Sequence, residues 1–403
     1  MPPPPPTAVV VPATPLPLPP TTPAPPPAPV EHPLSVGGAV RVGFILQDPS
    51  HPKSMSEVHF DPGNYSNAAE LRLHGDVTDY LSWTANFNTL FNGGTLATAY
   101  ASGSDGANNL ALSGPANATF GIEDLIAQIK FADEFQIWAG RLLVPSDRAN
   151  FSGPFFMSPW NYPGFYVAGA APIGPMEGFN GRNQGVTLWG NAIDAKLKYY
   201  VGAYGLDQGQ SNREASGPTA NAFYSGRISY SLQGSEAGYF GSDTYYGDKN
   251  VVTLGLGGQF MKDGSVDVAT GKPKDTTIGM ADILAEENVT GAGTFSFEAQ
   301  YYAFNGGYNF GNGDGLFSPR SAFFALFSYL TPENVGVGKL QPLVRWQQTI
   351  DPAWTIVDGA LAYVMKEYDA RVVLTYEHID LGHSAGAASG VSNGLQLGIQ
   401  LQK

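Results

Sequence analysis

Apolar and polar residues alternate along most of the chain after Ser35, with a period of two. In residues 391–402, for example, Leu395, Leu397 and Leu401 alternate with glutamines. A period of two places successive side chains on opposite faces of a β-strand. The pattern therefore predicts an all-β fold.

The alternation predicts sixteen strands, most of them near the 9–11 residues that a tilted strand needs to cross a bilayer. They are 35–47, 67–78, 80–90, 121–131, 134–144, 183–192, 194–206, 222–232, 249–261, 275–286, 290–304, 319–330, 339–349, 353–365, 367–379 and 391–402.

Tight turns alternate with long connections, as in a transmembrane antiparallel β-barrel with an even strand count. The long connections are 48–66, 91–120, 145–182, 207–221, 262–274 and 305–318. Residues 233–248 are long where a short turn is expected, so either that turn is elaborated or the count is off by a hairpin.

A soluble β-sandwich has the same period of two. Strand length and loop asymmetry favour the barrel instead. Tryptophans near strand ends also fit the interfacial girdles of a membrane barrel. They are Trp83, Trp138, Trp346 and Trp354.

The segment from Gly140 to about Arg182 is predicted to narrow the lumen. It begins as a strand end, breaks at Pro145, and continues as a loop rich in glycine, proline and aromatic residues. Structureless loops of this length are usually functional, and so much aromatic area is rarely left in water. The charged residues expected at this constriction are Arg141, Asp147, Arg148, Glu177 and Arg182.

Taking the polar phase of each strand as inward predicts the charges of the lumen. The basic residues are Arg41, Arg72, Lys130, Lys196, Lys198, Arg227, Arg345 and Arg371, and the acids include Glu70, Glu298 and Glu377. Most of the formal net charge of −14 is then expected in loops and turns. Rings of basic residues favour anions. The alternative is that these charges pair across strands and only keep the lumen hydrated.

Residues 1–34 form a separate proline-rich segment, because sixteen of the first thirty-three residues are proline. Proline fixes φ and donates no hydrogen bond, so an extended polyproline II tail on the periplasmic side of a barrel at 35–403 is expected. Such a tail could be a passive spacer, a tether to a periplasmic or cell-wall partner, or a plug for the pore.

Other functional classes find little support. The negative charge argues against nucleic-acid binding, and the absence of cysteine excludes thiolate chemistry. The six histidines form no nucleophile–base pattern and no cluster at ligand spacing. No enzyme activity, metal or cofactor is therefore expected.

The layout resembles the phosphate-selective porins of the outer membrane, the porin O and P family. The resemblance covers roughly residues 35–403, and its most specific part is Gly140–Arg148 with Phe155–Phe165. It implies an outer-membrane homotrimer, surrounded by lipid, with an inward-folded third loop and passive diffusion of small anions.

Two departures qualify the resemblance. Basic residues are sparse, which favours a general porin over a phosphate-specific one, and the chain ends on Leu401-Gln402-Lys403 instead of an aromatic residue. The rival function is a scaffold barrel that attaches to the cell wall or another envelope protein through its tail or surface loops.

Overall fold

The computed structural model describes residues 34–47, 59–61, 68–91, 118–153, 155–163, 182–205, 222–266, 270, 272–305, 320–350, 353–380 and 391–403. The expectations for the proline-rich tail up to residue 33 and for Glu177 fall outside the described residues.

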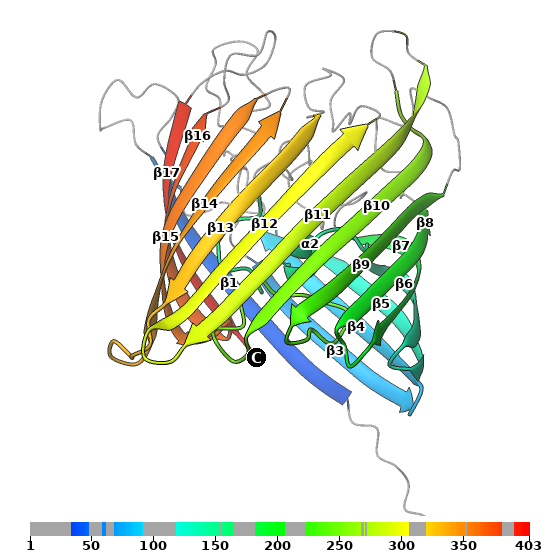
Figure 1. Ribbon diagram of the computed structural model, residues 1–403, viewed down its shortest axis with the longest axis horizontal. Coiled ribbons are helices and arrows are strands. Elements are labelled where there is room, and N and C mark those ends of the chain that lie inside the picture. Colours follow the sequence, from blue (N-terminus) through cyan, green and yellow to red (C-terminus); the bar gives the residue numbers. More distant parts are fainter. Residues whose placement is uncertain are drawn as a thin grey trace, which may run out of the picture. The chain divides into compact units, whose positions relative to one another are not determined.

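The strands form one antiparallel sheet that closes into a barrel (Figure 1). The sixteen long strands are β1 (Leu34–Gln47), β3 (Ala68–Thr78), β4 (Leu81–Phe91), β5 (Ala118–Ala132), β6 (Phe135–Leu143), β7 (Arg182–Ala192), β8 (Leu197–Gly205), β9 (Phe223–Gln233), β10 (Val251–Val266), β11 (Pro273–Val289), β12 (Gly293–Asn305), β13 (Ser321–Leu330), β14 (Lys339–Ile350), β15 (Trp354–Lys366), β16 (Ala370–Asp380) and β17 (Val391–Gln402). All sixteen predicted strands are confirmed, with ends shifted by a few residues. A short strand that was not predicted, β2 (His59–Asp61), pairs with the end of β1.

The barrel closes between the first and last long strands. Strand β1 pairs with β3 over its first half and with β17 over its second half. The closure extends to the last residue, because the backbones of Gly38 and Lys403 exchange two hydrogen bonds of 2.9 and 2.8 Å. A closed ring leaves no long strand edge unpaired.

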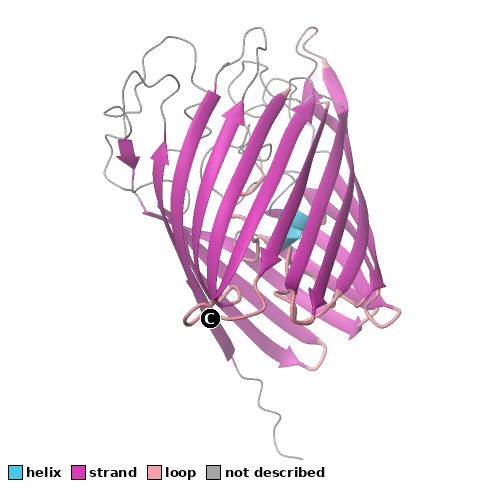
Figure 2. Ribbon diagram, turned by 60° about the vertical axis from the view of Figure 1, so that its left-hand side comes forward, coloured by secondary structure: helices cyan, strands magenta, loops and turns pink. Residues whose placement is uncertain are grey.

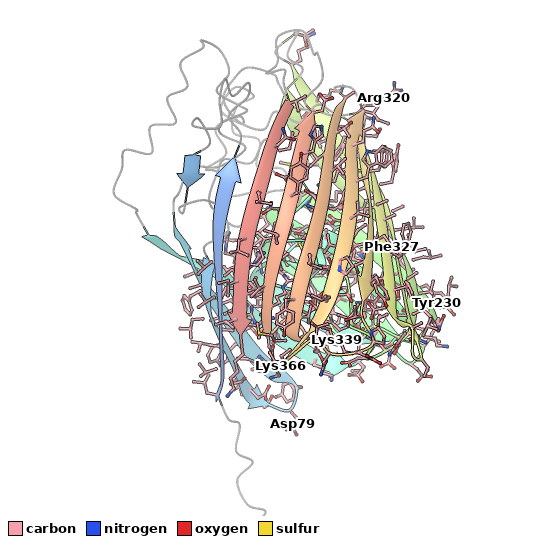
Figure 3. The ribbon with its side chains drawn as sticks, turned by 90° about the vertical axis from the view of Figure 1, so that its left-hand side faces the viewer. Asp79, Tyr230, Arg320, Phe327, Lys339 and Lys366 are labelled. Carbon is pink, nitrogen blue, oxygen red and sulfur yellow. The ribbon has the colours of Figure 1, made fainter. Side chains whose placement is uncertain are left out.

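The short connections lie at one end of the barrel. Asp79, Lys339 and Lys366 mark this end, and Arg320 lies at the opposite end (Figure 3). Left-handed backbone occurs in these turns at Asp194 (φ 53°) and Glu367 (φ 43°), as tight hairpins often require.

Residues 234–250, between β9 and β10, are the elaborated turn that the unusual length indicated. The count of long strands is therefore sixteen, and the short β2 is the seventeenth strand of the sheet. This segment is called the inner turn below, because much of it is buried: Glu236, Tyr239, Asp243 and Tyr246 are each at most 8% exposed.

The outer face of the barrel is apolar. Phe327 and Tyr230 project outward (Figure 3), and Leu395, Leu397 and Leu401 of the last strand are 41–54% exposed. This is the side-chain pattern of a sheet that faces lipid. None of the described helices is long and apolar enough to cross a membrane.

The inner face is not uniformly polar. Phe324 and Leu326 of β13 point inward and join a buried cluster with Val144 and Tyr302. Trp138 belongs to the same cluster and stacks on Tyr239, with 4.2 Å between ring centroids, so its assignment to an interfacial girdle was wrong. The strand alternation aims Trp138 inward, where the inner turn covers it.

Candidate functional site

A loop enters the barrel after β6. Pro145 ends the strand, and Asp147 caps the short helix α2 (Arg148–Ser152) by accepting a hydrogen bond of 3.0 Å from the Asn150 amide. The carboxylate at this position satisfies a helix N–H that has no intrahelical partner. The helix lies within the ring of strands (Figure 2). Residues 144–153 and 155–163 are called the inner loop below.

Strand β9 holds the beginning of the inner loop. The Ser225 hydroxyl donates to the Pro145 carbonyl, and Arg227 Nη1 donates to the Ser146 carbonyl at 3.1 Å. These bonds give the loop's backbone polar groups partners on the barrel wall.

The far end of the inner loop is bound to the opposite wall. Four wall side chains on β1, β14, β16 and β17 donate to its backbone carbonyls. The bonds are Arg41 Nη2 to Trp160 O (2.6 Å), Arg345 Nη1 to Asn161 O (2.9 Å), Arg371 Nη1 to Ser158 O (3.1 Å) and Gln400 Nε2 to Phe155 O (2.9 Å). In the ring, β14 lies across from β6, so the inner loop crosses the lumen.

Several predicted lumen cations therefore hold the loop in place. Arg41, Arg345 and Arg371 are each at most 5% exposed. The Arg41 guanidinium also lies 4.1 Å from the Trp160 ring centroid, a cation–π contact. These side chains bind protein carbonyls and rings and are largely shielded from water.

The inner turn covers the inner loop from the end with the short connections. Arg148 donates to both carboxylate oxygens of Glu236, at 2.8 and 2.7 Å. The Asp243 carboxylate accepts hydrogen bonds from the Ser158 amide at 2.9 and 2.7 Å and from the Tyr368 hydroxyl at 2.8 Å. The loop is thus fixed between the barrel wall and the inner turn.

The pKa values of two buried carboxylates of the inner turn shift in opposite directions. Burial raises the pKa of Glu236, but the Arg148 guanidinium lowers it more strongly, so the net pKa lies well below the usual range. Burial of Asp243 raises its pKa above the usual value, although hydrogen bonds from Ser158 and Tyr368 favour the ionised form.

Most of the interior charge is paired. The ion pairs are Arg72–Glu70 (2.6 Å), Arg182–Glu123 (2.5 Å), Arg182–Asp124 (3.1 Å), Arg345–Asp358 (2.6 Å) and the short contact Arg227–Asp282. Interior cations and carboxylates thus occur together, so the lumen wall is not a purely basic ring.

The structure brings together only part of the predicted constriction. Asp147 and Arg148 lie in the inner loop, and Arg182 begins β7 opposite Leu143, where the inner loop leaves the barrel wall. Arg141 is not among these residues, and its assignment to the constriction was wrong. Strand β6 continues to Leu143, so Arg141 still alternates and shares the outer face with its register partner Leu125, which is 54% exposed.

The remaining predicted lumen residues differ in position. Lys130 and Lys196 lie at the rim with the short turns, and Lys130 pairs with Asp133 at 2.6 Å. Lys198 and Glu298 are buried inside the barrel. Glu377 lies inside as well, opposite Asp358 in the register.

Sequence reasoning missed six interior acids, which are Glu123, Glu236, Asp243, Asp282, Glu286 and Asp358. Asp358 lies on a face of β15 that is otherwise largely apolar, and the face of β11 that holds Asp282 is mixed. Polarity alone therefore did not show which face of these strands points inward. Glu236 and Asp243 belong to the inner turn, for which the only signal was the anomalous length. Counting acids in the strands therefore underestimated the negative charge inside.

Comparison with known proteins places this geometry in a structural class. No protein-family model matches the chain, and no curated protein matches it in sequence. The fold does match solved structures. An anion-selective porin from Comamonas acidovorans aligns with a TM-score of 0.54 and 14% identity, covering 93% of this chain and 100% of the porin. The fold is that of the outer-membrane porins.

Two further porin structures agree. OmpF of Salmonella typhi, solved in complex with daunomycin, has a TM-score of 0.58 and 11% identity over 92% of this chain and 97% of its own. OprB of Pseudomonas putida has a TM-score of 0.55 and 11% identity over 92% and 94%. These likenesses concern the fold and are not specific to phosphate-selective porins.

Proposed function

We propose that the protein is an outer-membrane porin, a water-filled channel for passive diffusion of small hydrophilic solutes and ions. The observation that carries this proposal is the inner loop, which is bonded to both walls of a closed barrel whose outer face is apolar. A loop fixed across the lumen narrows the aqueous path, and the size and charge of a constriction determine which solutes pass.

A weak preference for anions is part of the proposal. Among the described interior charges, Arg72 and Arg182 keep 25% and 14% of their side chains exposed, whereas their partners Glu70 and Glu123 keep 7% and 4%. Water in the lumen therefore meets more of the cations than of the carboxylates. Because these charges are paired, the preference should be small and sensitive to salt.

The same proposal includes a homotrimer, as the resemblance to phosphate-selective porins implies, and a periplasmic tail. A phosphate-specific function is not proposed, because the interior arginines are paired with carboxylates or bonded to loop carbonyls. The interior arginines would have to lose these partners before they could bind phosphate.

The test is single-channel recording of the purified full-length protein in a planar bilayer under a salt gradient. We expect stepwise conductance and a reversal potential whose sign shows that anions permeate more easily than cations. Arg72→Met should shift the reversal potential toward cation preference, because it leaves Glu70 unpaired. Lys130→Met is the matched control, since it removes one positive charge at the rim.

A reversal potential that shows cation preference would contradict the proposed anion preference but not the proposed channel function. A protein that inserts but gives no conductance steps would reject the channel and favour a scaffold role.

A further inference from the structure

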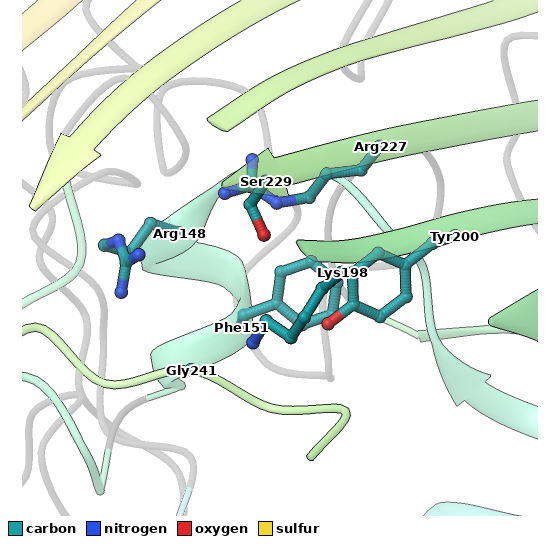
Figure 4. Close-up of a pocket in the computed structure, with 7 residues that line it drawn as sticks. All are labelled: Arg148, Phe151, Lys198, Tyr200, Arg227, Ser229 and Gly241. Carbon is teal, nitrogen blue, oxygen red and sulfur yellow. The ribbon is translucent and has the colours of Figure 1, made fainter. Parts of the chain in front are cut away.

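A small cavity lies between the inner loop and the wall formed by β8 and β9 (Figure 4). Its volume is about 10 Å³, which is room for one water-sized particle. The lining residues are Arg148, Phe151, Lys198, Tyr200, Arg227, Ser229 and Gly241. Three of the seven carry a positive charge, and none carries a carboxylate.

The positive charge around the cavity is not fully balanced by nearby ion pairs. Arg148 pairs with Glu236, and its Nε lies 3.8 Å from an oxygen of Asp282. Arg227 pairs with the same Asp282. Three cations thus share two carboxylates, and the ammonium of Lys198 forms no ion pair with any residue that the structure describes.

Burial makes this excess costly. Lys198 is only 7% exposed, and an ammonium removed from water is destabilising unless an opposite charge or hydrogen-bond acceptors surround it. The neighbouring Glu236 already binds Arg148 with both oxygens and accepts a hydrogen bond from the Tyr245 hydroxyl.

Donor groups approach the cavity from separate elements. Lys198 comes from β8, Ser229 and Arg227 from β9, and Arg148 from the inner loop (Figure 4). Arg148 Nε is buried and has no hydrogen-bond partner. Phe151 and Tyr200 form apolar walls, and an aromatic ring presents positive charge at its edge.

We propose that this cavity is a binding site for one monoatomic monovalent anion, chloride under ordinary conditions, held by Lys198 with Ser229 and Arg148. One negative charge there would offset Lys198, the lining cation that has no ion pair among the described residues. Room for one water-sized particle suits a monoatomic ion. The anion would be a resident component between loop and wall, which goes beyond the proposed function because this ion is not in transit through the pore.

The direct test is diffraction from crystals of the full chain grown or soaked in sodium bromide, recorded at the bromine absorption edge. One anomalous peak is expected in the cavity, in contact with Lys198 Nζ. Lys198→Met should abolish it. Lys249→Met is the matched control, because Lys249 donates to the Ser235 carbonyl, does not line the cavity, and should leave the peak unchanged.

A solution measurement separates residence from forced occupancy. At constant ionic strength, replacing gluconate with chloride should raise the thermal unfolding midpoint of the wild type by about 2 °C for each tenfold rise above the dissociation constant. Lys198→Met should lose this dependence.

The outcomes are distinct. No anomalous peak, or a water in its place, overturns the site. A bromide peak without any chloride effect on the midpoint means binding at crystal concentration only, and also overturns it. If Lys198→Met does not fold, the two wild-type measurements decide alone. If the protein gave no channel activity in bilayers, the evidence for or against the anion site would not change.

Discussion

At the scale of single residues, the interior arginines are most informative, because their positions followed from the sequence and their roles did not. Arg41 and Arg371 were placed inside by strand alternation, and they lie inside. Alternation cannot say what covers a side chain, however. A loop distant in sequence supplies the Trp160 and Ser158 carbonyls that these guanidinium groups bind.

The Arg148–Glu236 pair gives a prediction about stability. Glu236→Gln should lower the free energy of unfolding by about 3 kcal/mol at pH 7, because it leaves Arg148 buried without its counter-charge. Unfolding by guanidinium chloride in detergent micelles measures this loss. Glu333→Gln, an exposed change in the turn before β14, is the control and should be neutral.

The pH dependence of that loss follows from the direction of the pKa shift. The folded-state pKa of Glu236 is depressed. Its stabilisation is therefore complete above the unfolded value of about 4.3 and is lost progressively as the pH falls below it. The difference between wild type and Glu236→Gln should shrink below about pH 4. A difference that stays constant from pH 7 to pH 3 would contradict the role of this pair.

At the scale of elements, the inner turn is the least ordinary part of the barrel. The connections at one end of a membrane barrel are usually short turns. Residues 234–250, which lie at that end, instead fold inward and bind the inner loop through Glu236 and Asp243. The inner loop consequently has supports on three sides: β9, the opposite wall and this turn.

Deleting the inner turn tests whether it fixes the constriction. Joining Gly234 directly to Asn250 should preserve the barrel, lower its unfolding free energy by about 3–5 kcal/mol, and make the single-channel current larger and noisier, because Arg148 loses its partner. Shortening the exposed turn at residues 331–338 is the control and should change neither current nor noise. A quiet channel of unchanged conductance after the deletion would show that the wall contacts suffice.

Sequence reasoning predicted the strands well and the contacts of the loops poorly. Alternation identified all sixteen long strands because a two-residue period is a local property. The loop contacts could not be identified, because Ser158 and Asp243 are 85 residues apart and no local pattern pairs them. The inward-facing residues of strands such as β13 are apolar because they pack against the loop. The assumption that polar residues face inward therefore failed for these strands.

At the scale of the whole molecule, the tail and the barrel are expected to act separately. Deleting residues 1–32 should leave unfolding and conductance unchanged, because the described barrel begins at Leu34 and closes on itself. Chemical unfolding and single-channel conductance of the truncated protein check this expectation. Co-sedimentation with cell-wall material measures any attachment through the tail. A truncated channel with altered gating would indicate a plug instead of a tether.

The contacts of the inner loop also bear on the order in which the barrel is completed. Arg41 lies on the first strand, and Arg371 and Gln400 lie on the last two, so the loop spans the seam where the two ends of the chain meet. A ring that closed with this loop outside would enclose these side chains without their acceptors, at considerable energetic cost. We therefore expect docking of the loop and closure of the barrel between its first and last strands to occur as one cooperative step, in which the loop contacts stabilise only the correctly filled barrel.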